Sequence, residues 1–313
     1  MESVSLDTLT FDHPAASRPA RFGAMLSLPM QAASPSSCMV ILTSSAGVQR
    51  HREHFYAQAL NEAGIAALIV DSFGGRGVRR TVADQTLVSA AQMEGDAFAA
   101  LAWLRSDPRI DPGRIGIMGV SKGGGASLAA AIAVRQKWRR GFPHLFDLHV
   151  AICPGATAQH RDPTTHGRPI FFMLAARDDY TPAPLAIEYA ERMRAAGNRA
   201  IKVKVYGGAH HGWESLGPVF DIKDAENWSC CRNYIEDDGR HFVVAAGRAM
   251  PEPEYQAWAR EHCVTRGARA GGGTEDLRRR ATSDLIAFLQ DHGFGGAGAL
   301  VAKQPQAAPI RVD

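Results

Sequence analysis

The chain has 313 residues, of which 45% are hydrophobic and 21% are charged, and its formal net charge is +3 at pH 7. These values are typical of a globular protein large enough for one large α/β domain or two small ones. So small a net charge gives no reason to expect nucleic acid or a membrane as partner, and the arginine clusters lack the interleaved aromatic residues of a nucleic-acid surface.

The first residues, MESVSLDTLTFDHP, contain neither a basic region nor an apolar core, so we expect no signal peptide. No apolar run approaches the roughly 18 residues that a membrane-spanning helix needs. We therefore expect a cytoplasmic protein, in which the five cysteines would be free thiols by default. Nothing in the sequence indicates the oligomeric state.

Apolar runs of strand length alternate with segments of helical spacing along most of the chain. The predicted strands are residues 3–11, 21–28, 38–43, 65–70, 115–118, 149–153, 169–175 and 200–206. The predicted helices are residues 55–63, 88–104, 126–134, 183–196 and 274–290. This alternation predicts an α/β fold, with a mostly parallel twisted sheet covered by helices on both faces. Ligands of such sheets bind beyond the carboxyl ends of the strands.

The strand 115–118 runs into Gly119-Val120-Ser121-Lys122-Gly123, and a helix of small residues follows. Gly-x-Ser-x-Gly between a strand and a helix is the pattern of a nucleophile elbow, whose tight turn strains the serine backbone and lifts the hydroxyl above the sheet. The flanking glycines avoid collisions that a Cβ would cause there. The pentapeptide alone is a weak signal, but its context favours a catalytic Ser121 over an ordinary Gly-rich turn.

Ser121, Asp178 and His211 each follow a predicted strand, so a parallel sheet would bring them to one edge. Their order along the chain is that of the α/β-hydrolases. A serine hydroxyl needs a histidine to accept its proton, and that histidine needs a carboxylate to fix its tautomer. The residues alone leave Asp179 open as the acid. His210 is better suited to a pocket wall than to the role of base.

An oxyanion hole needs two backbone N–H donors. We expect one from Lys122, which follows the nucleophile, and the other from the loop Thr43-Ser44-Ser45-Ala46-Gly47. Ser45 is the first choice in that loop and Ser44 is a close alternative. The small residues would equally suit a plain strand-to-helix turn.

Four segments together resemble the dienelactone hydrolase family of α/β-hydrolases. They are Gly-x-Ser-x-Gly-Gly at 119–124, Ala-Arg-Asp-Asp-Tyr-Thr-Pro at 176–182, Gly-Ala-His-His-Gly-Trp at 208–213 and Val-Asp-Ser-Phe-Gly-Gly-Arg-Gly at 70–77. The resemblance runs from about residue 21 to residue 213 and resumes at the last helix. It implies that Asp178, four residues before a proline, is the acid, and that His211, before Gly-aromatic, is the base.

The chain departs from the family pattern at two places. Ser121 stands where the namesake enzyme has a cysteine, and Thr43-Ser44 stands where the pattern has His-Gly. The first departure favours a broader esterase activity over the namesake lactone reaction. The resemblance also implies that an arginine binds a substrate carboxylate. Arg76 matches that position approximately, although it would equally cap the next helix or pair with Asp84.

Residues 213–273 break the alternation, because they are polar, rich in tryptophan and tyrosine, and end in Gly-Gly-Gly, which we interpret as a linker. Within a single α/β-hydrolase domain of residues 1–313, we expect this excursion to cover the active site and to line its acyl or alcohol pocket, with Trp213 at the substrate. A bridge from Cys231 or Cys230 to Cys263 would anchor it, but the expected location favours reduced thiols. Residues 293–313 are expected to be disordered.

These features together predict a serine hydrolase that needs no cofactor or metal and cleaves a small-molecule ester or lactone through an acyl-enzyme. The alternatives are an amide or thioester hydrolase on the same triad, and a non-catalytic binding member of the fold. Metal-dependent hydrolysis would have to use His210 and His211 with the cysteines, whose spacing is not that of a zinc site.

Overall fold

The structure is a computed structural model that describes residues 1–13, 16–30, 35–139 and 142–295. The tail expected to be disordered lies mostly outside the described residues. Among the residues that the structure describes, no helix is long and apolar enough to cross a membrane.

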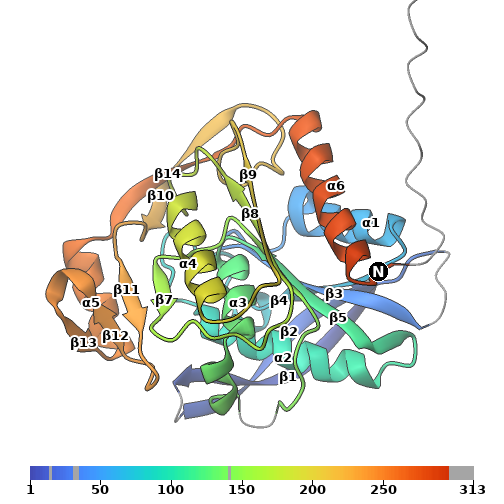
Figure 1. The fold of residues 1–313 in the computed structure, drawn as a ribbon, viewed down its shortest axis with the longest axis horizontal. Helices are drawn as coiled ribbons and strands as arrows, with labels where there is room; N and C mark the ends of the chain where they lie inside the picture. The colour runs from blue at the N-terminus through green and yellow to red at the C-terminus, as the bar shows by residue number, and fades with distance from the viewer. Residues whose placement is uncertain (14–15, 31–34, 140–141, 296–313) are drawn as a thin grey trace, which may run out of the picture.

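An eight-stranded sheet forms the centre of the molecule, in the order β1-β2-β4-β3-β5-β6-β8-β9 (Figure 1). The first two strands form an antiparallel hairpin at one edge, and the strands from β4 to β9 run parallel. The strands are β1 (Glu2–His13), β2 (Ala16–Ser27), β3 (Ser36–Leu42), β4 (Ala66–Asp71), β5 (Ile110–Val120), β6 (His149–Ile152), β8 (Ile170–Ala175) and β9 (Ile201–Tyr206). The prediction of a mostly parallel α/β sheet is confirmed.

Helices cover both faces of this sheet (Figure 1). On one face lie α1 (Phe55–Glu62) and α6 (Glu275–Asp291), and on the other lie α2 (Ala90–Ser106), α3 (Lys122–Ala131) and α4 (Ala183–Ala195). In β3, Met39 and Ile41 pack with α1 and α6, whereas the alternate side chains pack with α2. A strand covered on both faces must be apolar at every position, which explains its continuous apolar run.

The helix after the elbow begins at Lys122, four residues earlier than expected. Its first turn is Lys-Gly-Gly-Gly, which has a low intrinsic helix propensity. The tight turn overrides that propensity, because the Ser121 carbonyl accepts a hydrogen bond from the Gly125 amide at 2.9 Å and so closes the first helical turn.

The segment between β9 and α6 carries secondary structure of its own, which we call the insert (residues 219–271). Its long strands β10 (Val219–Asn227) and β14 (Thr265–Gly271) pair antiparallel. A second, four-stranded sheet has the order β13-β12-β11-β7. Its members are β11 (Asn233–Ile235), β12 (His241–Val243), β13 (Arg248–Met250) and β7 (Ala158–His160), and α5 (Glu252–His262) packs on it. Figure 1 shows α5, β11, β12 and β13 (orange) on the side of the molecule away from α1 and α6, with β7 (yellow-green) between them and the central sheet.

Two features of this region differ from the sequence expectations. Cys231 and Cys263 form a disulfide, while Cys230 is free and exposed, so the expectation of reduced thiols is wrong for this pair. The glycines at 271–273 are not a linker. A Cβ on Gly273 would lie 2.0 Å from the carbonyl oxygen of Trp213, so glycine is needed there for close backbone packing.

Candidate active site

The turn at Ser121 has the strained backbone that a nucleophile elbow requires. Ser121 has φ 58° and ψ −115°, a conformation that costs a non-glycine residue roughly 1–3 kcal/mol. A Cβ on Gly119 would lie 2.3 Å from the carbonyl carbon of Gly123, and one on Gly123 would lie 2.5 Å from the Thr43 carbonyl oxygen. Both glycines are therefore required for this close approach of β5, α3 and β3.

Asp178 and His211 follow β8 and β9 and meet at the carboxyl edge of the sheet. Nδ1 of His211 lies 2.8 Å from Oδ2 of Asp178, and both side chains are buried. Oδ1 of Asp178 accepts the backbone amides of Tyr180 at 2.9 Å and Thr181 at 2.8 Å. Since a carboxylate only accepts, Nδ1 of His211 carries a proton and donates it to Asp178.

The carboxyl group of Asp178 is held in its ionised form. Burial by itself would raise its pKa, but the hydrogen bond from His211, together with the amides of Thr181 and Tyr180, holds the pKa below its ordinary value. The arrangement thus supplies a fixed negative charge beside the imidazole, which stabilises an imidazolium.

The hydroxyl of Thr181 is a third member of this contact that the sequence reasoning did not single out. Its Oγ1 lies 2.9 Å from Oδ2 of Asp178, 3.0 Å from Nδ1 of His211 and 2.9 Å from the carbonyl oxygen of Cys153. The signal that could have identified it is its place in the Asp-Asp-Tyr-Thr-Pro turn, three residues after the acid. Thr181 therefore connects the carboxylate–histidine pair to the end of β6.

Asp179 and His210, the chain neighbours of Asp178 and His211, make other contacts. Asp179 accepts the backbone amide of Arg269 at 2.9 Å and pairs with its Nε at 2.7 Å, so it anchors β14. His210 lines a surface cavity together with Asp178, Asp179 and Arg269. Within the described part of the chain, Nδ1 of His210 has no hydrogen-bond partner.

In the described part of the chain, neither of the two expected oxyanion donors, the amides of Lys122 and Ser45, has an acceptor outside its own element. Lys122 is the first residue of α3, and the first amides of a helix have no intrahelical acceptor. The Ser44 amide points at the buried carboxylate of Glu53, at 3.4 Å. For the Ser45 amide we find no acceptor among the described residues, whereas its carbonyl accepts from Thr81 at 2.7 Å. The geometry therefore favours Ser45 over Ser44.

The loop between β4 and α2 joins both sides of the site through Gln85, which the sequence reasoning also missed. Its Oε1 accepts from the Ser45 hydroxyl at 2.9 Å, and its Nε2 donates to the Tyr180 hydroxyl at 2.8 Å. The Tyr180 ring lies edge-on to the His211 ring, with centroids 5.1 Å apart. The Gln85 backbone amide donates to Glu226 of β10 at 2.7 Å, so this residue also ties the site to the insert.

The Lys122 side chain fastens the same loop. Its ammonium group donates to Thr81 Oγ1 at 2.9 Å and to the carbonyl oxygens of Gln85 and Val88 at 2.8 and 2.7 Å. Burial lowers the pKa of Lys122 to about 7, although Asp84 and Glu226 oppose this shift. The three acceptors match the three protons of an ammonium group.

The role expected of Arg76 is wrong. Its two terminal nitrogens bind the two carboxylate oxygens of Asp96 at 2.7 and 2.9 Å, and the Asp96 side chain is 0% exposed. A buried carboxylate needs such a partner, so the guanidinium is not available to a substrate carboxylate. The alternative partner Asp84 is also wrong, because Asp84 binds Arg260 at 2.6 Å.

Trp213 does not contact a substrate site either. Its side chain is fully buried in the core that α1 and α6 form with the sheet, and its ring lies 5.2 Å from that of Tyr206. Gly212 has φ 65°, which permits the turn between His211 at the site and Trp213 in the core. The expectation that Trp213 lines the pocket is therefore corrected.

Among the described residues, one group of three metal-ligand side chains comes together, namely Cys153, Asp178 and His211, whose ligand atoms lie within 4.8 Å of one another. Burial and the charge of Asp178 raise the pKa of the Cys153 thiol well above its ordinary value. The thiol is therefore protonated, whereas a metal ligand would have to be a thiolate.

The mostly parallel sheet, the strained serine turn and the carboxylate–histidine pair at its carboxyl edge define an α/β-hydrolase. Residues 22–226 match the model of the dienelactone hydrolase family, and the chain belongs to that family. It is accordingly a carboxylic ester hydrolase. No curated protein matches the sequence.

Solved structures of esterases share the fold. Thermogutta terrifontis esterase 2 phosphoramylated by tabun has a TM-score of 0.57 and 14% sequence identity, over 93% of this chain and 96% of that chain. The native form of the same esterase has a TM-score of 0.54 at 14% identity, over 94% of each chain. A putative dienelactone hydrolase from Klebsiella pneumoniae has a TM-score of 0.51 at 19% identity, over 68% of this chain and 89% of that chain. Identities this low show the fold alone.

Proposed function

We propose that this protein hydrolyses a small-molecule carboxylic ester or lactone with Ser121 as nucleophile, His211 as base and Asp178 as the acid that orients it. The observation that carries the proposal is the buried hydrogen bond of 2.8 Å from Nδ1 of His211 to Oδ2 of Asp178. It stands at the sheet edge at which the strained Ser121 also lies, and it fixes the tautomer that leaves Nε2 able to accept a proton.

In the proposed reaction, Oγ of Ser121 attacks the ester carbonyl carbon while Nε2 of His211 takes its proton. The carbonyl electron pair moves to the oxygen, where the backbone amides of Lys122 and Ser45 stabilise the charge. When the tetrahedral intermediate collapses, the carbon–oxygen bond to the alcohol breaks and His211 gives its proton to the alcohol. Water then attacks the acyl carbon while Nε2 of His211 takes a proton from it. The bond from that carbon to Oγ breaks, His211 returns the proton to Ser121, and the carboxylic acid leaves.

The test is covalent labelling together with turnover. A fluorophosphonate probe should label the wild type and Ser127→Ala equally, because Ser127 lies on the same helix α3 but outside the site. Labelling and hydrolysis of p-nitrophenyl acetate should both be absent in Ser121→Ala. Labelling that persists in Ser121→Ala would assign the nucleophile to another residue, and a wild type that neither labels nor hydrolyses any ester would leave only a binding function. A parallel panel of amides and thioesters would reveal the leaving group that the enzyme prefers.

A cytoplasmic location stays a prediction. The disulfide between Cys231 and Cys263 weighs against it, because such bonds persist mainly in oxidising compartments.

A further inference from the structure

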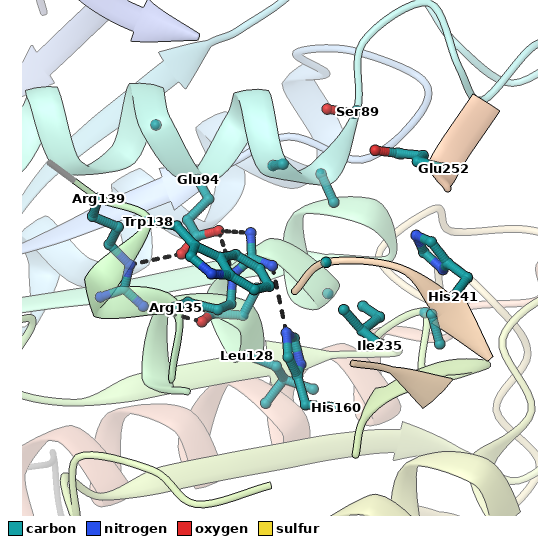
Figure 2. A pocket seen from close by; sticks show the side chains of 18 of the residues that line it. Ser89, Glu94, Leu128, Arg135, Trp138, Arg139, His160, Ile235, His241 and Glu252 are labelled. Atoms are coloured by element: carbon teal, nitrogen blue, oxygen red, sulfur yellow. Dashed lines mark hydrogen bonds and ion pairs between the residues drawn. The ribbon is translucent and has the colours of Figure 1, made fainter. Parts of the chain in front are cut away.

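A cavity of about 270 Å³ lies between the insert and the helices α2 and α3. The body of the protein contributes small residues from α2 and α3, which leave room for a ligand, and the insert closes the opposite side with Ile235, Gly239, His241 and Glu252. Figure 2 shows Ile235 and His241 on one side of the cavity and Trp138, Arg135 and Glu94 on the other.

This cavity adjoins the backbone of the proposed nucleophile. Gly125 and Gly155 both line it, and their amides donate to the carbonyl oxygen of Ser121 at 2.9 and 3.3 Å. The cavity lining is therefore hydrogen-bonded directly to the backbone of Ser121. The insert, which was expected to contribute to the substrate pocket, closes the opposite side of this cavity.

The charged residues at one end of the cavity largely neutralise one another. The buried carboxylate of Glu94 accepts from Nε of Arg135 at 2.8 Å and from Nε of Arg139 at 2.9 Å. These three charges sum to +1. Nη2 of Arg139 donates to the carbonyl oxygens of Ala129 and Ala130 at 3.3 and 3.0 Å, at the C-terminal end of α3, where the helix dipole is negative. The remaining positive charge is thus offset by the protein itself.

Two guanidinium nitrogens at this end are available: Nη1 of Arg139 has no hydrogen-bond partner among the described residues, and Nη1 of Arg135 is only loosely engaged. Nη1 of Arg135 lies 3.4 Å from Nε2 of His160, a long contact, while Nδ1 of His160 lies 3.1 Å from the Tyr189 hydroxyl. Burial and the neighbouring Arg135 lower the pKa of His160 well below its ordinary value, so its ring is neutral. The Arg135 guanidinium also lies over the Trp138 ring, 4.8 Å from its centroid. The cavity therefore offers guanidinium donors of Arg135 and Arg139 beside flat side chains such as Trp138 and His160.

We propose that this cavity binds the part of the ester remote from the scissile bond, and that it takes an aromatic group with one neutral hydrogen-bond acceptor placed opposite Arg135. The inference rests on the proposed function. The volume of the cavity is close to the lower limit of about 300 Å³ for small-molecule sites, which suits a single ring with a short substituent. The rings of Trp138, Tyr189, His160 and His241 line it and match a flat ligand. Because the local charge is already offset, a neutral acceptor suffices.

Filling the cavity provides the first test. Ala91 of α2 lines the cavity, whereas Ala102 lies about three turns along the same face of the helix, is exposed and does not line it. Ala91→Phe should lower kcat/KM for p-nitrophenyl 3-(4-methoxyphenyl)propanoate at least tenfold and leave p-nitrophenyl acetate within twofold. Ala102→Phe, the matched control, should change neither. Acetate esters of 4-methoxybenzyl alcohol, measured in parallel, show whether the cavity holds the acyl or the alcohol side. Equal effects of Ala91→Phe on small and aromatic esters in both series would overturn the proposal.

The proposed hydrogen bond from Arg135 to an acceptor on the ligand is tested with Arg135→Lys. This substitution keeps the positive charge beside Glu94 but removes the second donor of the planar guanidinium. Wild type should prefer the 4-methoxy ester over the matched 4-ethyl ester, and Arg135→Lys should remove that preference. A preference that survives the substitution contradicts the role of Arg135. A thermal unfolding curve for each variant identifies any that fails to fold, in which case Ala91→Phe decides.

A binding experiment separates this inference from the proposed chemistry. In Ser121→Ala, which cannot turn over, anisole should bind saturably and more tightly than ethylbenzene, with a shift of the Trp138 indole N–H signal in NMR. Ala91→Phe should abolish that shift. If no ester is hydrolysed but anisole binds in this way, the proposed reaction fails and the pocket stands. If esters are hydrolysed but anisole does not perturb Trp138, the pocket assignment fails alone.

Discussion

Asp178 accepts a hydrogen bond of 2.8 Å from Nδ1 of His211, whereas its chain neighbour Asp179 binds Arg269 of β14 at 2.7 Å. Two adjacent carboxylates therefore serve different parts of the molecule, one the candidate active site and the other the attachment of the insert. Their spacing in the sequence could not distinguish them, because each follows the same strand by only a few residues.

Asp178→Asn should lower kcat about 10⁴-fold, as in the serine-protease precedent, because the amide holds the wrong histidine tautomer. Asp179→Asn should lower kcat less than tenfold, since that carboxylate faces Arg269. Steady-state kinetics on p-nitrophenyl acetate measures both. The reverse order of effects would transfer the role of acid to Asp179.

Ser121→Ala should abolish ester hydrolysis and keep the fold, and His211→Ala should cost a similar factor because triad members act as a unit. The activity of His210→Ala should stay within a few fold of wild type, since His210 lies in the wall of a surface cavity. A strongly impaired His210→Ala together with an active His211→Ala would exchange the two assignments.

Ser121→Gly should raise the free energy of unfolding by about 1 kcal/mol, because it removes the strain at φ 58°. Urea denaturation measures this gain, and a loss of stability in Ser121→Gly would show that the turn is not strained.

Thr181→Val should lower kcat about tenfold with little change in KM, because its hydroxyl positions Asp178 and His211 without touching the substrate. Thr181→Ser should restore most of the activity. Thr164→Val is a matched control, since the Thr164 hydroxyl also binds an aspartate, Asp162 at 2.6 Å, but far from the site in the chain. An increase in KM with unchanged kcat would contradict the positioning role.

Lys122→Met should change how stability depends on pH. The folded-state pKa of Lys122 is lowered to about 7 from an ordinary 10.5. Between these values the unfolded chain holds a proton that the folded chain has released, so wild-type stability gains with rising pH, by up to about 1.4 kcal/mol per unit. The difference in free energy of unfolding between wild type and Lys122→Met should therefore grow in favour of wild type from pH 7 to pH 9. A constant difference would show that the pKa is not lowered. Lys223→Met, at an exposed position, is the control.

Cys231→Ser should lower the free energy of unfolding of the insert by about 3–4 kcal/mol, because the bridge to Cys263 spans 32 positions of the chain. The free and exposed Cys230 offers the matched control Cys230→Ser, which should have no effect. Chemical denaturation with and without dithiothreitol measures the difference. Wild type that is indifferent to the reductant would contradict a stabilising bridge.

The sequence alone was sufficient to predict the central sheet, the serine turn and the meeting of Asp178 with His211. The reason is that these features depend on local patterns. A strand buried on both faces is apolar throughout, as in 38–43, and a tight strand-to-helix turn requires glycines at Gly119 and Gly123. Residues that follow the parallel strands must meet at one edge of the sheet, as Asp178 and His211 do.

Only the tertiary structure decided which long-range partner each polar side chain takes. Arg76 binds Asp96 on α2, Gln85 joins Ser45 to Tyr180, and Trp213 enters the core rather than a pocket. Such pairs depend on how separate elements pack, and the charge or ring of a single residue is equally compatible with several partners. The cavity beneath the insert has the same origin, because its walls come from segments more than a hundred residues apart, brought together where β11 pairs with β7.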